Sequence, residues 1–140
     1  MKRIFIDTGA WIALNSKKDK HFKDAISANK SFLNDGYYYV TSDYVLDETF
    51  TLLRSVVGHK RAVEFGNEIL SLKDMSKILV FHTDQVILDK AWKIFETYSD
   101  KDFSFTDCTS FSIMERVKIK VAFSFDKHFD QYGFLRLPFL

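Results

Sequence analysis

Apolar residues occur along the chain in short continuous runs, separated by longer segments in which apolar and polar positions alternate at helical spacing. The runs cover residues 4–6, 37–40, 78–81, 121–125 and 134–137. Runs that are apolar throughout, rather than at every second position, are typical of parallel strands covered on both faces. We therefore predict an α/β fold, a three-layer α/β/α sandwich with about five mostly parallel strands.

The segments between the runs have apolar residues three and four positions apart, which predicts amphipathic helices. These helices are expected over residues 21–34, from about 42 to 57, 60–72, 85–98 and 105–117. The first run should lie near the middle of the sheet, because helices must be placed on both of its sides. Two inward stripes are predicted, one of Phe22, Ala25, Ile26, Asn29 and Leu33, and one of Val86, Leu88, Ala91, Ile94 and Phe95.

The composition is typical of one globular domain, which we predict to span residues 1–140. Hydrophobic residues make up 46% and charged residues 28%, and a single proline leaves little room for linkers. The net charge of +1 excludes a globally basic surface, so binding of a polyanion needs a local patch. The only cysteine, Cys108, rules out a disulfide within the chain. With no apolar run near the roughly 18 residues of a membrane span, we expect a cytoplasmic protein.

Two carboxylates stand where predicted strands end. Asp7 follows the first apolar run directly, and Asp126 follows the fourth. In open α/β sheets, ligands bind outside the carboxyl ends of the strands, so both acids are candidates for chemistry. The plainer alternatives are that Asp7 caps the next helix and that Asp126 is an ordinary turn acid.

Two further acids lie on apolar helix faces. Glu48 shares its face with apolar neighbours, which is costly unless something binds the carboxylate, whereas Asp47 should face solvent. Asp107 lines up with aromatic residues one turn away on either side. Residues Ser104 to Asp107 also resemble a capping box, in which the fourth residue bonds back to the first. Both helix starts should lie at the sheet edge that holds the strand-end acids, so a cap and a site do not exclude each other.

Four carboxylates gathered at one edge would repel one another. A single pair 4 Å apart costs about 4 kcal/mol at an effective dielectric of 20. A hard divalent cation removes this cost, and Mg²⁺ or Mn²⁺ bound by oxygen ligands supports phosphodiester hydrolysis.

The ordered set of motifs resembles the PIN domain family, and within it the VapC-like ribonuclease toxins of toxin–antitoxin modules. The resemblance covers essentially the whole chain and rests on residues 4–8, 44–48, 104–108 and 123–129. It implies that the catalytic and metal-binding residues are Asp7, Glu48, Asp107 and Asp126. Secondary site residues would be Thr8, Thr106, Ser124 and Asp130. Gly9, where the family often has Ser or Asn, and Ser124, where it often has Thr, depart from the family pattern without removing a carboxylate.

The resemblance also implies a function. We expect a Mg²⁺- or Mn²⁺-dependent endoribonuclease that cuts single-stranded RNA or exposed RNA loops. The same resemblance implies a toxin of a type II pair, a homodimer and a small antitoxin partner. Among the basic residues, Lys127 and His128 flank Asp126 and are the best candidates for contacts with RNA phosphates. Lys17, Lys18 and Lys20 form a second basic group, and a solvated surface remains the alternative for both.

Rival functions are disfavoured by specific positions. An aspartyl-phosphate enzyme would carry a second Asp two residues after Asp7, where Gly9 stands. Neither glycine-rich nucleotide-binding motif occurs. A non-catalytic PIN-like module that binds RNA or protein remains the alternative, and calorimetric titration with Mg²⁺ and Mn²⁺ would separate it from an enzyme.

Overall fold

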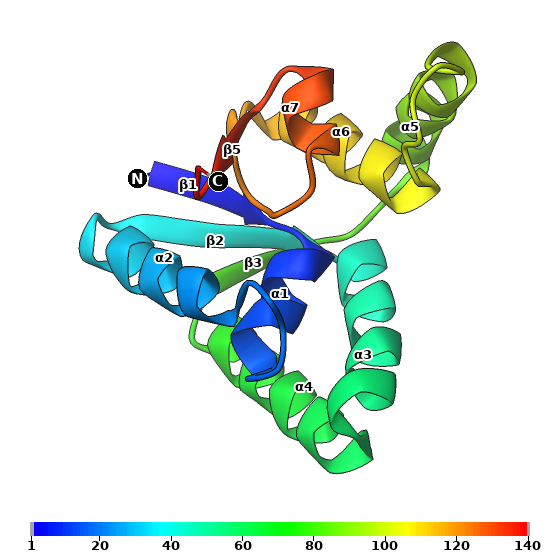
Figure 1. Cartoon of the computed structure of the whole chain (residues 1–140). Helices are drawn as coiled ribbons and strands as arrows, with labels where there is room; N and C mark the ends of the chain where they lie inside the picture. The colour runs from blue at the N-terminus through cyan, green and yellow to red at the C-terminus, as the bar shows by residue number, and fades with distance from the viewer. Residues whose placement is uncertain (1, 140) are drawn as a thin grey trace.

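A parallel sheet forms the centre of the protein in the computed structural model, which describes residues 2–139 (Figure 1). Its strands are β1 Lys2–Ile6, β2 Tyr37–Ser42, β3 Ile78–Phe81, β4 Val121–Phe123 and β5 Leu135–Leu137. Within the described residues, the order is β3-β2-β1-β4-β5, and each neighbouring pair is parallel. The predicted α/β/α fold and the central place of the first strand are confirmed.

The helices cover both faces of the sheet. They are α1 Thr8–Asn15, α2 Phe22–Asn34, α3 Asp43–Val57, α4 His59–Asp74, α5 Gln85–Thr97, α6 Phe105–Val117 and α7 His128–Tyr132. Figure 1 shows α1, α2 and α4 on one side of the sheet and α6 and α7 on the other, with α3 and α5 beyond the carboxyl ends of the strands. The short helix α7 was not predicted. In residues 2–139, no helix is both long enough and apolar enough to cross a bilayer.

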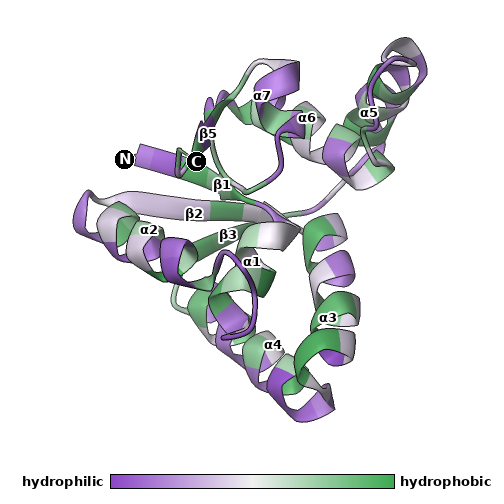
Figure 2. Ribbon diagram, in the orientation of Figure 1, coloured by the Kyte–Doolittle hydropathy of each residue, from purple (hydrophilic) through white to green (hydrophobic). Residues whose placement is uncertain are grey.

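The polarity of β1 explains how the first acid is positioned. Lys2 and Arg3 are exposed, whereas the next three residues of the strand are fully buried, and Figure 2 shows this change from polar to apolar along β1. At the end of the strand, the backbone N–H of Asp7 donates to the carbonyl of Phe123 at 3.1 Å. This bond joins the carboxyl ends of β1 and β4, so the residues that follow the two strands emerge side by side.

Two predicted helix faces are wrong in part. In α2, the structure buries Ala25, Ala28 and Phe32, while Leu33 from the predicted stripe is 56% exposed. In α5, Val86 is 62% exposed and Phe95 44% exposed, although both were predicted to face inward. Both helices carry apolar residues on more than one side, so helical spacing alone defines no unique inward stripe.

Candidate functional site

A cleft of about 770 Å³ opens at the carboxyl edge of the sheet. Its lining includes Asp7, Glu48, Asp107 and Asp126, which come from four separate segments of the chain. The structure therefore brings together the four acids that the sequence places at one edge, while their roles in metal binding and catalysis stay predictions. Gly9 also lines the cleft, and a Cβ at this position would meet no atom within 4 Å, so the glycine leaves open space there.

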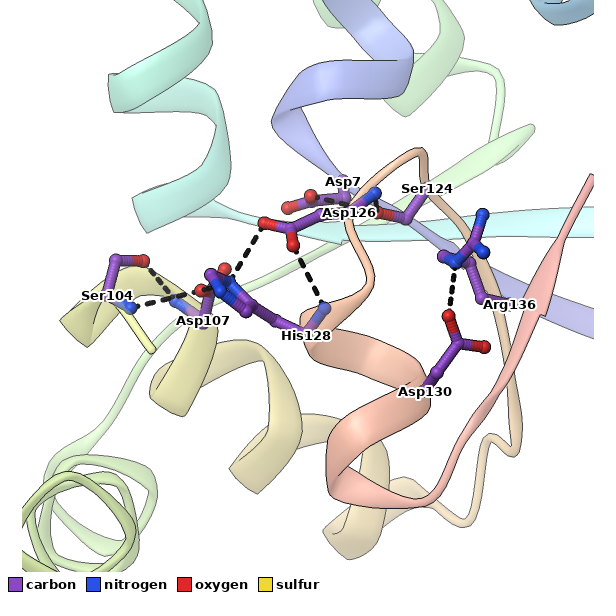
Figure 3. Close-up of polar contacts among 8 residues, drawn as sticks. All are labelled: Asp7, Ser104, Asp107, Ser124, Asp126, His128, Asp130 and Arg136. Carbon is purple, nitrogen blue, oxygen red and sulfur yellow. Dashed lines mark hydrogen bonds and ion pairs between the residues drawn. The ribbon is translucent and has the colours of Figure 1, made fainter. Parts of the chain in front are cut away.

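Asp7 lies at the bottom of a short chain of hydrogen bonds. It precedes α1, but its side chain makes no capping bond, so the interpretation of Asp7 as a side-chain cap is wrong. Instead, its Oδ2 accepts from the Ser124 hydroxyl at 3.2 Å, and Ser124 Oγ accepts from the backbone N–H of Asp126 at 3.0 Å (Figure 3). Ser124 thus fixes Asp7 relative to the loop that carries Asp126.

The surroundings of Asp7 disfavour its charge. The residue is only 5% exposed. Burial raises the pKa of its carboxyl to about 8, and the negative charges of Asp107, Asp126 and Glu48 act in the same direction. A group of this kind favours either a proton or a bound cation.

Asp107 serves as a cap and lines the cleft at the same time. Its backbone N–H donates to Ser104 Oγ at 2.9 Å, and its Oδ2 accepts from the Ser104 N–H at 3.0 Å, which completes the predicted capping box. The side chain is nonetheless largely buried, and burial raises the pKa of the carboxyl, opposed by the bond from Ser104. The two interpretations of Asp107 therefore hold together.

His128 joins two of the acids, as Figure 3 shows. Its Nδ1 lies 2.8 Å from Asp107 Oδ2 and 3.1 Å from Asp126 Oδ2, and its backbone N–H donates to Asp126 Oδ1 at 2.9 Å. When both carboxylates are ionised they can only accept, so Nδ1 must carry the proton. Donor atoms of the three side chains lie within 4.8 Å of one another. The predicted phosphate contact of His128 stays a prediction.

Glu48 and Thr8 enter the cleft from two helices in contact. Glu48 is half-buried on α3, while its neighbour Asp47 is exposed, as predicted. The Thr8 hydroxyl, at the start of α1, donates to the Val45 carbonyl of α3 at 3.4 Å. This bond helps to set the helix that carries Glu48 against the end of β1.

Of the predicted secondary residues, Ser124 is fully buried and is connected to the cleft through its hydrogen bond to Asp7, and two others do not line the cleft either. Asp130 is exposed on α7 and pairs with Arg136, with Oδ2 to Nε at 2.6 Å, on the side of α7 away from the other acids (Figure 3). Thr106 is half-buried at the start of α6, and its carbonyl accepts from the Thr109 hydroxyl. We therefore leave both out of the proposed site.

The cleft also holds residues that the sequence analysis did not single out. The loop after α1 returns to the cleft and contributes Asp19, Lys20 and His21, and Asp102 and Phe125 complete this part of the lining. Lys17 and Lys18, which were grouped with Lys20, are exposed and are not part of the lining. The signal available in the sequence was only the polar break after the first helix.

The charge of the cleft does not suit a polyanion by itself. Six carboxylates line it, and the only fully charged cations in the lining are two lysines, Lys20 and Lys127. Like charges at this density disfavour the approach of RNA unless a cation lies among the acids.

Comparison with known proteins agrees with this geometry. The PIN domain family matches residues 4–135. Over 134 residues, 96% of this chain and 97% of the relative, the sequence is 31% identical to the 23S rRNA-specific endonuclease VapC20 of Mycobacterium tuberculosis. It is 28% identical over 127 residues, 89% of this chain and 77% of the relative, to a VapC ribonuclease of Archaeoglobus fulgidus.

Solved structures show the same fold. The crystal structure of M. tuberculosis VapC20, described as a sarcin–ricin loop cleaving toxin, superposes with a TM-score of 0.83 at 32% identity and covers 94% of this chain and 96% of that one. DNA-bound VapBC from Salmonella typhimurium shares the fold alone, with a TM-score of 0.65 at 14% identity, over 97% of this chain and 96% of that one. The match to the family over nearly the whole chain and the VapC relatives together show that this chain belongs to the PIN domain family, within its VapC-like group.

Proposed function

We propose that this chain is a divalent-metal-dependent endoribonuclease, the toxin of a toxin–antitoxin pair, and that it acts as a single domain. The observation that carries the proposal is the convergence of Asp7, Glu48, Asp107 and Asp126 on one cleft. The ribonuclease activity named for the VapC relatives supports the same conclusion.

The donor set fits a hard divalent cation. Carboxylate oxygens are the ligands that Mg²⁺ and Mn²⁺ favour. Burial, together with the nearby carboxylates, raises the pKa of Asp7, and a bound cation would offset both causes. We propose Asp7, Glu48, Asp107 and Asp126 as the residues that hold the ion. When bound, the cation supplies the positive charge that polarises a phosphodiester and activates water for its hydrolysis.

Three further side chains, two in the lining of the cleft and one buried beside it, position these acids and the substrate. Ser124 holds the Asp7 carboxylate by its hydroxyl, and His128 keeps Asp107 and Asp126 together through Nδ1. Lys127 is exposed on the rim of the cleft, where its ammonium is free to contact a phosphate oxygen of the RNA.

Substrate and partners follow from the relatives as proposals. The substrate named for VapC20 makes the sarcin–ricin loop of 23S rRNA the first substrate to test, and a ribosomal RNA substrate would support the expected cytoplasmic location. The VapC-like family membership supports a small antitoxin partner, and a short reading frame next to the gene would identify a candidate. A homodimer is supported by exposed aromatic residues of α5, where Trp92 is 56% and Phe95 44% exposed.

Cleavage of a sarcin–ricin stem–loop and of total ribosomal RNA tests the function. Wild-type protein should cut RNA in the presence of Mg²⁺ and should not cut it in excess EDTA. The cleavage rates of Asp7→Asn and Asp107→Asn should each be at least about 100-fold lower than that of wild type, the order of magnitude expected for groups that stabilise charge in the transition state. Asp130→Asn, outside the cleft, is the matched control and should retain activity. RNA that is bound but never cut, with no heat on titration with Mg²⁺, would favour the non-catalytic module instead.

A further inference from the structure

An aromatic pair forms part of the cleft wall beside the acids. His21, from the loop after α1, lies flat against Phe125, which follows β4. Their ring centroids are 4.3 Å apart, and the ring planes differ by 3°. Both rings are half-buried, and both line the cleft, so the pair gives the cleft an aromatic wall.

The pair is held from both sides. The backbone N–H of His21 donates to Asp19 Oδ1 at 2.8 Å, which fixes the turn before the ring. Phe125 packs edge-on against the fully buried ring of Phe123 at 6.1 Å. Its chain neighbours Ser124 and Asp126 are linked to each other by a hydrogen bond. The surface is therefore preformed, directly next to a proposed metal-binding acid.

We propose that His21 and Phe125 form a stacking wall for one nucleobase of the RNA, adjacent to the phosphate that is cut. Flanking phosphates contact Lys20 and Lys127. This inference rests on the proposed function and adds to it a base-binding subsite.

The chemistry of the wall selects a base and not a phosphate. Unpaired RNA bases stack on aromatic side chains, including histidine, and such stacking tolerates any base because each has a flat face. Six carboxylates line the cleft and repel phosphate, whereas the rings of His21 and Phe125 carry no negative charge. Lys20 precedes His21, and Lys127 lies two residues after Phe125, and both lysines are exposed in the lining. Each ring of the wall therefore has, within two residues of it in the chain, a lysine of the same cleft that can contact a phosphate next to the stacked base.

A purely structural role for the pair predicts a different result. If the stacked rings only held the loop after α1 against the residues after β4, their loss would lower the free energy of unfolding. It would not change how much more tightly the protein binds an RNA with bases than one without them. The decisive measurement therefore compares an RNA that has bases with one of the same length that has none.

Fluorescence anisotropy with labelled decauridylate and with an abasic ten-residue ribose-phosphate chain makes this comparison, with Ca²⁺ in place of Mg²⁺ to slow hydrolysis. Wild-type protein should bind decauridylate more tightly than the abasic chain. His21→Ala and Phe125→Leu should each reduce this advantage at least about fivefold, the lower end of base–aromatic stacking. His21→Phe, which keeps an aromatic face, should retain it. His82→Ala removes an exposed histidine outside the cleft and should change nothing.

The outcomes separate the two proposals. If His21→Ala and Phe125→Leu keep the full advantage of decauridylate, or if His21→Phe loses it, the stacking wall is wrong while cleavage by wild type still stands. A wild-type protein that neither binds nor cuts RNA overturns the proposed function together with the wall. Thermal denaturation of each variant, compared with wild type, identifies any that fail to fold. Phe125→Tyr keeps an aromatic face and should retain the advantage of decauridylate, so its loss in a folded Phe125→Tyr variant would also contradict the stacking wall.

Discussion

Replacing Asp7 by asparagine should stabilise the metal-free protein at pH 8 although it removes activity. Burial raises the pKa of Asp7 to about 8, from a usual value of 3.8. The folded protein therefore retains a proton that the unfolded chain releases between about pH 4 and pH 8. Because the folded state binds more protons across this window, the contribution of Asp7 to the free energy of unfolding falls as the pH rises.

The size of the effect follows from the shift. One pKa unit corresponds to about 1.36 kcal/mol, so Asp7 destabilises the metal-free fold by at most about 5 kcal/mol at pH 8. Asparagine keeps an oxygen for the Ser124 hydroxyl but adds an amide N–H₂ group, and leaving this group without a partner costs about 1–3 kcal/mol. We expect a net gain of about 2–4 kcal/mol at pH 8, or roughly 6–15 °C in Tm for a chain of this size.

Thermal and urea denaturation in EDTA at pH 5 and pH 8 measure this gain. The gain of Asp7→Asn over wild type in the free energy of unfolding should vanish near pH 5. At pH 8, Mg²⁺ should reduce this gain, because the ion binds and stabilises the folded wild-type protein. Asp130→Asn removes the ion pair between the exposed Asp130 and the half-buried Arg136, and should stay within about 1 kcal/mol of wild type at both pH values. A variant that gains nothing at pH 8, or gains equally at pH 5, would refute the argument from buried charge.

Three other substitutions or reactions test single features of the site. Glu48→Gln should lower the cleavage rate at least about tenfold by removing a charge from the cleft, while Asp47→Asn, its exposed neighbour, should stay within about twofold in the same assay. Ser124→Ala removes the hydroxyl between Asp7 and the Asp126 N–H, and should lower the free energy of unfolding by about 1–3 kcal/mol in urea. The buried Cys108 thiol, with its pKa raised to about 11, should not react with a disulfide reagent at pH 8 until urea unfolds the protein; a fast native reaction would contradict its burial.

The sequence was sufficient to place the acids because two simple rules agree. Continuous apolar runs indicate parallel strands, and residues that follow such strands meet at one edge. Asp7 and Asp126 satisfy both rules directly. Asp107 belongs to a predicted capping box with Ser104, and the structure contains both hydrogen bonds of that box. These features are local in the chain, so they could be predicted without knowing how the elements pack.

Features that depend on packing could not be predicted. The meeting of His21 with Phe125 requires the loop after α1 to return to the cleft, and no local pattern encodes that path. The contact of His128 with two carboxylates depends on how α7 sits against the start of α6. Likewise, the spacing of apolar residues in α2 predicts an apolar stripe but does not determine which side of the stripe faces the sheet. Phe32 is therefore buried, whereas Leu33, which was predicted to be in the stripe, is exposed.

The position of His128 leads to a signed prediction about metal affinity. In the metal-free protein, the Nδ1–H of His128 lies between the carboxylates of Asp107 and Asp126, where a cation would bind. Because Mg²⁺ prefers oxygen donors, an ion at these carboxylates must displace the hydrogen bonds of the ring, each worth about 1.5–3 kcal/mol when the partner is charged. His128→Ala should therefore bind Mg²⁺ at least about tenfold more tightly in calorimetric titration. The exposed-histidine control His82→Ala should match wild type, and if His128→Ala bound Mg²⁺ more weakly, the ring would be a ligand and not a competitor.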